Sequence, residues 1–239
     1  MKKIGYCILL VLFGTFGFAQ SLTVESKTVK NEEGNETDAW VAHLDQLPEE
    51  CMESYDDFMD EVFHKKTEKI NKGMKVVSRT QFHELSNLRI DQRAIFIAES
   101  GGTAVAFTFS PGYDVHFGPK TYPDEFKNAE RFVKSFVKFH YKDFYKKKIS
   151  SLEGTIKDKQ GQISSNEKRI EKNKKSILDN NKDIDKGGSD AGKLKIRNEG
   201  MENENLSLSG DISKNRSEIS VLQEQLSKLN ENLRKVEDF

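Results

Sequence analysis

The sequence predicts an α+β fold, in which a small antiparallel sheet packed by helices is followed by a long antiparallel coiled-coil helical hairpin. Three observations lead to this prediction. Helical and strand patterns alternate with turn residues over 39–145, the expected head domain. Isoleucine then recurs every seven residues from Ile149 to Ile184, which is the period of a coiled coil. A glycine-rich turn at 186–192 interrupts this repeat, and a second heptad run completes a hairpin over 146–239.

Residues 1–19 are predicted to be a signal peptide. Lys2 and Lys3 precede an apolar run that ends in small residues, as at a cleavage site. The run is too short for a membrane span, which needs roughly 20 residues. We therefore expect a periplasmic or secreted mature chain with no membrane span after signal cleavage. Residues 20–38 show little apolar periodicity and predict a linker, in which Leu22–Val24 could form an edge strand.

Charge and cysteine content limit the classes of partner. The chain has 38 basic and 39 acidic residues, and two of the basic ones lie in the predicted signal peptide. This balance gives no reason to expect a nucleic-acid partner. Cleavage would leave Cys51 as the one cysteine. A disulfide within the chain is then excluded, whereas a disulfide between two chains is still allowed. Its place in an apolar helical stripe favours a buried thiol.

The predicted head contains two helices and three or four strands. Pro48 and Pro123 each open a helix with acidic residues in the first turn, which suits the helix dipole. The second helix has no stop signal and runs directly into the heptads. Strands are expected in an antiparallel meander, with a hairpin turn at Ser100-Gly101-Gly102. Their predicted ranges are 74–80, 93–99, 103–110 and, less regularly, 113–117.

Asparagine occupies several core positions of the heptads where an apolar residue is expected. In an antiparallel hairpin with its turn at 186–192, Asn180 faces Asn198 and Asn173 faces Asn205. Facing amides can satisfy one another, and they penalise a slip of register. This pairing predicts an apolar, stable base and a looser polar tip. Three layers remain mismatched: Asn166 faces Ile212, Asn215 faces Ile163, and Lys159 faces Ile219.

The repeat also allows a different assembly. The unit I-x-x-N-x-x-x begins at Ile163, Ile170 and Ile177 and resembles the stalk repeats of trimeric adhesins. That resemblance implies a parallel three-stranded coiled coil with asparagine rings in its core. Gly187, at a core position of the continued frame, favours the hairpin instead.

Four sequence patterns could carry a ligand, and each has a simpler explanation. Residues 187–193 nearly spell a phosphate-binding loop, but Leu194 replaces the magnesium-binding hydroxyl and a helix precedes the loop. Asp114 and His116 share a strand face without further ligands at a metal spacing, and His83 or His140 could join them only through the fold. The carboxylates of 49–61 lack a calcium-loop pattern. The lysines of 127–175 alternate with acidic residues, as on a coiled-coil exterior.

The sequence therefore predicts an exported, non-enzymatic binding or scaffolding protein with a coiled-coil projection. No catalytic, cofactor-binding or metal-binding residue is assigned. The expected partner is a protein or a cell-envelope component, and a homo-oligomer is also allowed. The alternatives are a periplasmic holdase-type chaperone, by analogy of architecture, and the parallel trimeric stalk.

Overall fold

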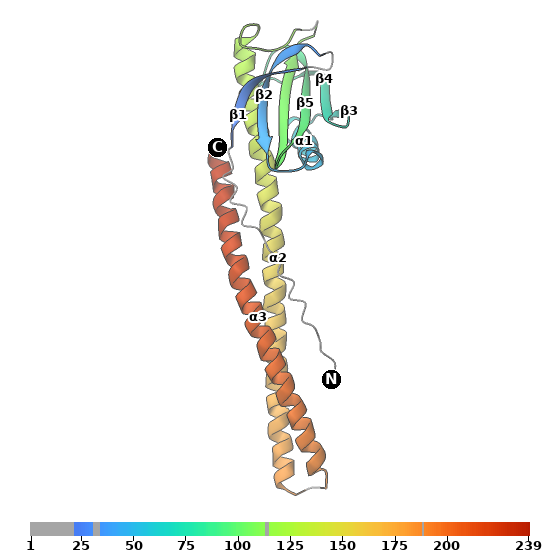
Figure 1. Ribbon diagram of the computed structural model, residues 1–239, viewed down its shortest axis with the longest axis vertical. Helices are drawn as coiled ribbons and strands as arrows, with labels where there is room; N and C mark the ends of the chain where they lie inside the picture. The colour runs from blue at the N-terminus through green and yellow to red at the C-terminus, as the bar shows by residue number, and fades with distance from the viewer. Residues whose placement is uncertain (1–21, 31–33, 113–114, 188) are drawn as a thin grey trace.

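The protein is an elongated molecule with a head at one end and two long helices that extend from it (Figure 1). The computed structural model describes residues 22–30, 34–112, 115–187 and 189–239. The predicted signal peptide lies outside the described residues. The head and the hairpin together confirm the predicted α+β fold with a helical hairpin.

The head is built on a six-stranded antiparallel sheet in the order β1-β2-β6-β5-β4-β3. The strands are β1 Val24–Lys30, β2 Glu36–Leu44, β3 Glu68–Asn71, β4 Met74–Gln81, β5 Arg89–Glu99 and β6 Gly102–Ser110. The predicted hairpin turn joins β5 to β6, with Gly101 at a φ of 96°. Glycine adopts this left-handed backbone without steric penalty.

The sheet is wider than the predicted three or four strands. All of β1 and the start of β2 lie within 20–38, so most of the predicted linker belongs to the sheet, and its edge strand runs over Val24–Lys30 instead of Leu22–Val24. The reason is that β1 is an edge strand with mostly exposed side chains, so it carries no apolar alternation. Residues 113–114 of the expected strand at 113–117 lie outside the described part, and its described residues, 115–117, form no strand. Val115 makes a bridge with Gly112, and the Phe117 N–H donates to the carbonyl oxygen of Phe109 at 2.8 Å.

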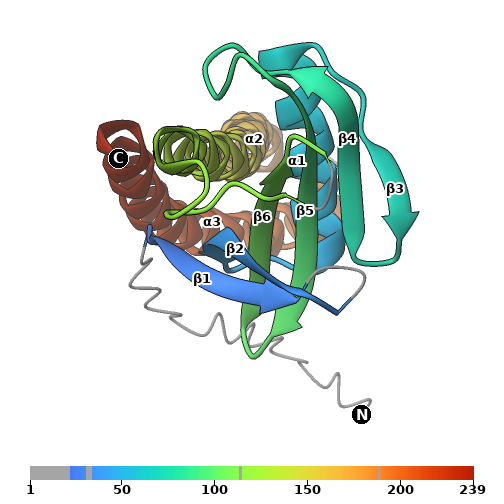
Figure 2. The same cartoon turned by 90° about the horizontal axis from the view of Figure 1, so that it is seen from above.

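Helices cover one face of the sheet (Figure 2). Helix α1, Pro48–Phe63, and the first part of helix α2, Pro123–Asp185, enclose an aromatic core with β5 and β6. The Tyr55 ring meets the Phe136 ring edge-on, with 5.7 Å between centroids. The Trp40 indole N–H donates to the carbonyl oxygen of Phe126 at 2.7 Å and so ties β2 to the start of α2.

Helix α2 continues from the head into the hairpin without a break, as the absence of a stop signal predicts. The predicted boundary between 145 and 146 therefore falls inside one continuous helix. After the turn, helix α3, Ala191–Asp238, returns along α2 in the opposite direction. The structure thus has the antiparallel hairpin and not the parallel stalk arrangement.

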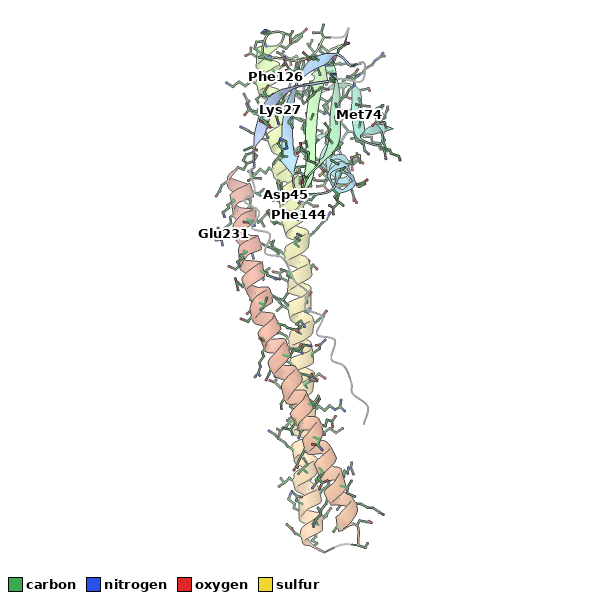
Figure 3. All side chains as sticks on the ribbon, viewed as in Figure 1. Lys27, Asp45, Met74, Phe126, Phe144 and Glu231 are labelled. Carbon is green, nitrogen blue, oxygen red and sulfur yellow. The ribbon has the colours of Figure 1, made fainter. Side chains whose placement is uncertain are left out.

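The end of α3 packs against the core of the head. Val236 is fully buried, and Leu229, Leu233 and Phe239 pack beside it. The Lys138 ammonium of α2 donates to the carbonyl oxygen of Glu237 at 2.6 Å. Phe144 and Glu231 mark the level at which the two helices meet the head (Figure 3). Both arms of the hairpin are therefore anchored to the head.

Candidate functional site

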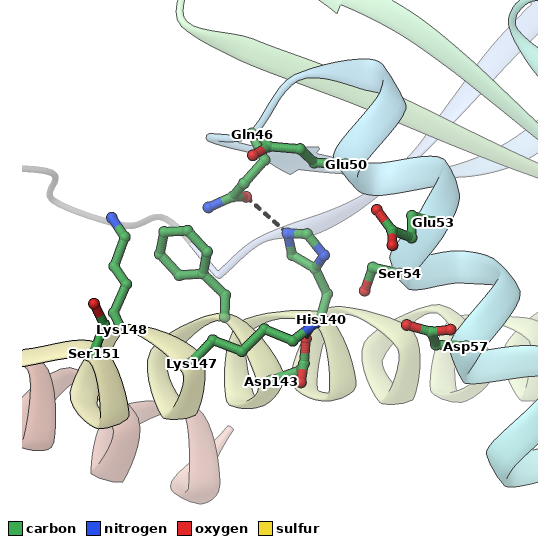
Figure 4. Close-up of a pocket in the computed structure, with 11 residues that line it drawn as sticks. Gln46, Glu50, Glu53, Ser54, Asp57, His140, Asp143, Lys147, Lys148 and Ser151 are labelled. Atoms are coloured by element: carbon green, nitrogen blue, oxygen red, sulfur yellow. Dashed lines mark hydrogen bonds and ion pairs between the residues drawn. The ribbon is translucent and has the colours of Figure 1, made fainter. Parts of the chain in front are cut away.

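A groove between α1 and α2 is the first candidate site (Figure 4). Its walls come from the loop before α1, from one side of α1, and from the stretch of α2 between His140 and Ser151. Its volume is about 330 Å³. The groove lies where α2 leaves the head, at the base of the hairpin.

His140 forms the inner end of the groove. The side chain is 3% exposed, and its Nε2 lies 2.7 Å from Oε1 of Gln46. With the Gln46 carbonyl as acceptor, Nε2 carries the hydrogen and Nδ1 keeps a free lone pair. Nδ1 is buried without a hydrogen-bond partner, as is Oγ of Ser54 on the facing side of α1. Burial lowers the pKa of His140 to about 4, so the ring is neutral at neutral pH.

Carboxylates predominate on the rim of the groove. Lys147 forms an ion pair with Asp143 at 2.8 Å, and the Lys148 ammonium lies 4.2 Å from the centroid of the Phe144 ring. Glu53 and Asp57 line the same rim and form no hydrogen bond or ion pair with the described residues. The pKa of Lys147 is raised, first by its hydrogen bond to Asp143 and further by the charges of Asp57 and Glu53. The groove thus favours positive charge.

The core of the hairpin is the second candidate feature, because it contains the predicted amide layers. Nδ2 of Asn180 donates to Oδ1 of Asn198 at 2.7 Å, and Nδ2 of Asn173 donates to Oδ1 of Asn205 at 3.0 Å. Asn198 also donates to Oδ1 of Asn181 at 2.7 Å. These pairs confirm the predicted register.

In two of the three mismatched layers, the polar side chain contacts the residue next to the one predicted to face it. Buried Asn215 donates to Oε1 of Gln162 at 3.2 Å, and Lys159 forms an ion pair with Glu218 on the facing arm. Asn166, opposite Ile212, is only partly buried. Gln162 and Glu218 flank the core positions 163 and 219, and their side chains reach inward. Pairing of core positions alone does not predict these contacts.

The other patterns seen in the sequence do not come together as sites. Residues 187–193 form the turn between the arms and the start of α3, with residue 188 outside the described part. Asp114 also lies outside it, while His83 is exposed, away from the buried His140. In the described ranges no group of three His, Cys, Asp or Glu residues could hold a metal ion.

Some charged residues of the acidic face of α1 and of the basic face of α2 form ion pairs within the protein, and the others face solvent. Asp56 pairs with Lys75 of β4 at 2.6 Å, while Glu53 and Asp57 face the groove. On α2, Lys134 pairs with Glu130 and Lys147 with Asp143, as the alternation of charge predicts, while Arg169 pairs with Glu204 on α3. The lysines of 168–175 are exposed.

Cys51 is fully buried, as its position in the apolar stripe predicts. Burial raises the pKa of its thiol to about 12, so the reactive thiolate is scarce at neutral pH. A disulfide between chains through this residue would require the head to open.

The groove could not have been found from the sequence alone. Gln46 and Ser54 lie far from His140 in the chain, and the three residues belong to no motif. One indication was available, since His140 occupies an apolar face of its helix, where a polar residue needs a partner. In the sequence, this histidine suggested only a metal ligand.

No family model, curated protein or solved structure matches this chain. Among the described residues, no helix is long and apolar enough to cross a membrane. The geometry of the head and the hairpin is therefore the basis for a function.

We expect a histidine on the sheet face away from the helices to make stability depend on pH. His43 of β2 lies between Glu99, at 2.8 Å from Nδ1, and Glu25, at 3.0 Å from Nε2. Opposite it on β6 is Ala104. Partial burial lowers the pKa of His43, but the hydrogen bonds to Glu99 and Glu25 outweigh burial and raise it overall.

Because the folded pKa of His43 is raised, its contribution to stability is fully present below the unfolded pKa of about 6.5. That contribution disappears as the pH rises through the folded pKa. We expect His43→Gln to lose more stability relative to wild type at pH 6 than at pH 9, measured by urea unfolding. His83→Gln serves as the control for loss of an exposed histidine. A deficit that grows with rising pH would contradict this assignment.

Proposed function

We propose that this chain is an exported, non-enzymatic binding or scaffolding protein that uses the hairpin to hold its head away from, or toward, a protein or envelope partner. The observation that carries the proposal is the double anchoring of the hairpin. Helix α2 is continuous with the head, and the buried Val236 fixes the end of α3 to the same core. An arm that starts at residue 146 extends about 60 Å at 1.5 Å per residue.

The amide layers support this role because they give the projection one register. A purely apolar hairpin could slip by three or four residues at little cost, whereas such a slip here would take Asn180 away from Asn198 and place it opposite Leu194 or Met201. A spacer must have a defined length, and a fixed register provides it.

Binding fits the chemistry of the head better than catalysis does. The neutral His140 is a weak base at neutral pH, and efficient general bases have pKa values near the operating pH. Its Nε2 is already engaged by Gln46. The ring is suited to accept a hydrogen bond from a ligand.

The chaperone alternative has less support. A holdase needs an apolar surface that is open to an unfolded client. Large apolar side chains are exposed on the described arms at Leu178 of α2 and at Ile196, Leu206 and Val221 of α3, and mostly polar residues lie between those of α3. Failure to suppress aggregation of an unfolded outer-membrane protein at stoichiometric ratio would remove this alternative.

A shortened hairpin tests the proposed role. Deletion of 164–184 together with 194–214 removes three heptads from each arm, keeps the turn, and leaves Ile163 opposite Asn215. We expect a folded head on an arm shorter by about 32 Å. A photo-crosslinker at Ile196, exposed near the tip, should capture a partner in cells in the full-length chain. In the shortened chain a crosslinker at Ser217, the corresponding place near the new tip, should lose that product.

The matched control keeps the length and changes only the surface, by replacing the exposed Leu206 with serine. It should leave the crosslinked product unchanged. An identical set of products from the full-length and shortened chains would contradict a role for the length of the hairpin.

A further inference from the structure

The groove between α1 and α2 combines an unused acceptor with excess negative charge. Nδ1 of His140 is buried in a side chain that is 3% exposed, and it has no donor. A buried acceptor without a donor destabilises the site that contains it. A ligand that brings an N–H group would relieve this penalty.

The rim determines which charge such a ligand carries. Four carboxylates line the groove, from Glu50, Glu53, Asp57 and Asp143, against the ammonium groups of Lys147 and Lys148. The side chain of Glu50 is occupied by the backbone N–H of Leu47 at 3.1 Å. Asp143 is occupied by Lys147. Glu53 and Asp57 are therefore the carboxylates left to meet a ligand.

Lys147 and Lys148 show how the groove receives cations. The Lys147 ammonium is held by Asp143 at 2.8 Å, and the Lys148 ammonium lies over the ring of Phe144 at 4.2 Å. Phe144 also gives the groove an apolar wall on which a methylene chain can pack. The groove thus offers both carboxylates and an aromatic face to an alkyl chain that ends in a positive charge.

We propose that this groove binds a primary alkylammonium group, presented either by a lysine side chain of a partner protein or by a free alkyl diamine. The ammonium group donates to Glu53 and Asp57, its alkyl chain lies along Phe144, and His140 supplies the neutral acceptor at the inner end. A volume of about 330 Å³ accommodates such a chain. An anion would instead meet the carboxylates of Glu53 and Asp57.

This site is independent of the proposed role of the hairpin. The shortened chain described above retains every groove residue, so it should still bind the ammonium probes. If the full-length chain captures no partner but binds the probes, the proposed role of the hairpin has failed. If it captures a partner but does not bind the probes, the proposed groove site has failed.

The test uses three small probes on the full mature chain. The first is Nα-acetyl-lysine methylamide, the second is 1,5-diaminopentane, and the third is the uncharged Nα-acetyl-norleucine methylamide. We expect at least one ammonium probe to bind at least about tenfold more tightly than the norleucine probe, since hydrogen bonds to charged groups are strong. Calorimetry measures the affinities. The ¹⁵N shift of His140 Nδ1 should also move with the ammonium probes and not with norleucine.

The source of the ligand follows from which probe binds. Binding of the lysine probe alone indicates a protein partner, binding of diaminopentane alone indicates a free amine, and either result supports the site. Absence of binding by both ammonium probes, or equal binding of the norleucine probe, would overturn it.

Matched variants locate the binding. Glu53→Gln and Asp57→Asn remove charge from exposed rim positions without changing side-chain size, and each should weaken ammonium binding about tenfold. Asp60→Asn removes the same charge from an exposed position of α1 that does not line the groove, and should have little effect. An equal loss in all three variants would show general charge attraction and would overturn the site.

Discussion

Val236→Asp is expected to detach the end of α3 from the head and to lower the free energy of unfolding by roughly 3 kcal/mol. Val236 is fully buried among core residues of the head. The substitution removes its apolar contact and places an unpaired carboxylate there. The last turns of α3 can move into solvent without unfolding the head. The decrease in the free energy of unfolding is therefore limited to the free energy of the contact between the end of α3 and the head.

Hydrogen exchange measured by mass spectrometry should show the effect in residues 229–239, and thermal unfolding should show the loss of stability. Val221→Asp is the matched control, since the same substitution falls on the same helix at a side chain that is 56% exposed. Unchanged protection of 229–239 in Val236→Asp would contradict the anchoring of α3 and remove the main support for a rigid projection.

Replacement of one amide of the Asn180–Asn198 pair is expected to destabilise the tip of the hairpin by about 1–3 kcal/mol. Asn198 is 7% exposed and contacts both Asn180 and Asn181. In Asn198→Ala the amide of Asn180 loses its partner across the interface. Asn203→Ala, at an exposed position of the same helix, should change stability by less than about 0.5 kcal/mol.

The double variant Asn180→Leu with Asn198→Leu should recover most or all of the lost stability, because two leucines pack where two amides were paired. A double-mutant cycle with thermal unfolding measures the coupling between the two positions. Additive losses, with no recovery in the double variant, would contradict the pairing. The double variant should also populate a slipped register or a second oligomeric state, which light scattering would detect.

The features that were predictable from sequence share a strong local period. The heptads fix which residues face the other arm, and the turn at 186–192 fixes the register, so the contacts of Asn173 and Asn180 follow directly. Helices α1 and α2 begin at Pro48 and Pro123 as predicted, because proline and acidic first turns act locally.

The features that were missed depend on tertiary contacts. Strand β1 has little apolar pattern because it is an exposed edge, so the sequence indicated an edge strand only at Leu22–Val24, and pairing with β2 defines its full extent. The groove brings together Gln46, Ser54 and His140 from separate elements, and no spacing in the chain indicates that they meet. Val236 occupies a heptad core position, and the sequence does not show that it packs against the head instead of only against the other arm.

The return of α3 along α2 is the central claim, and one distance tests it most directly. Spin labels at Lys157 and Ser220 occupy exposed positions on the two arms. Double electron–electron resonance should give a separation of about 20–30 Å, since packed helix axes lie about 8–10 Å apart and the labels add their own length. The distance should persist when labelled protein is diluted into excess unlabelled protein. A helix that continued straight would separate the labels by about 90 Å, and that result, or a short distance that disappears on dilution, would contradict the hairpin.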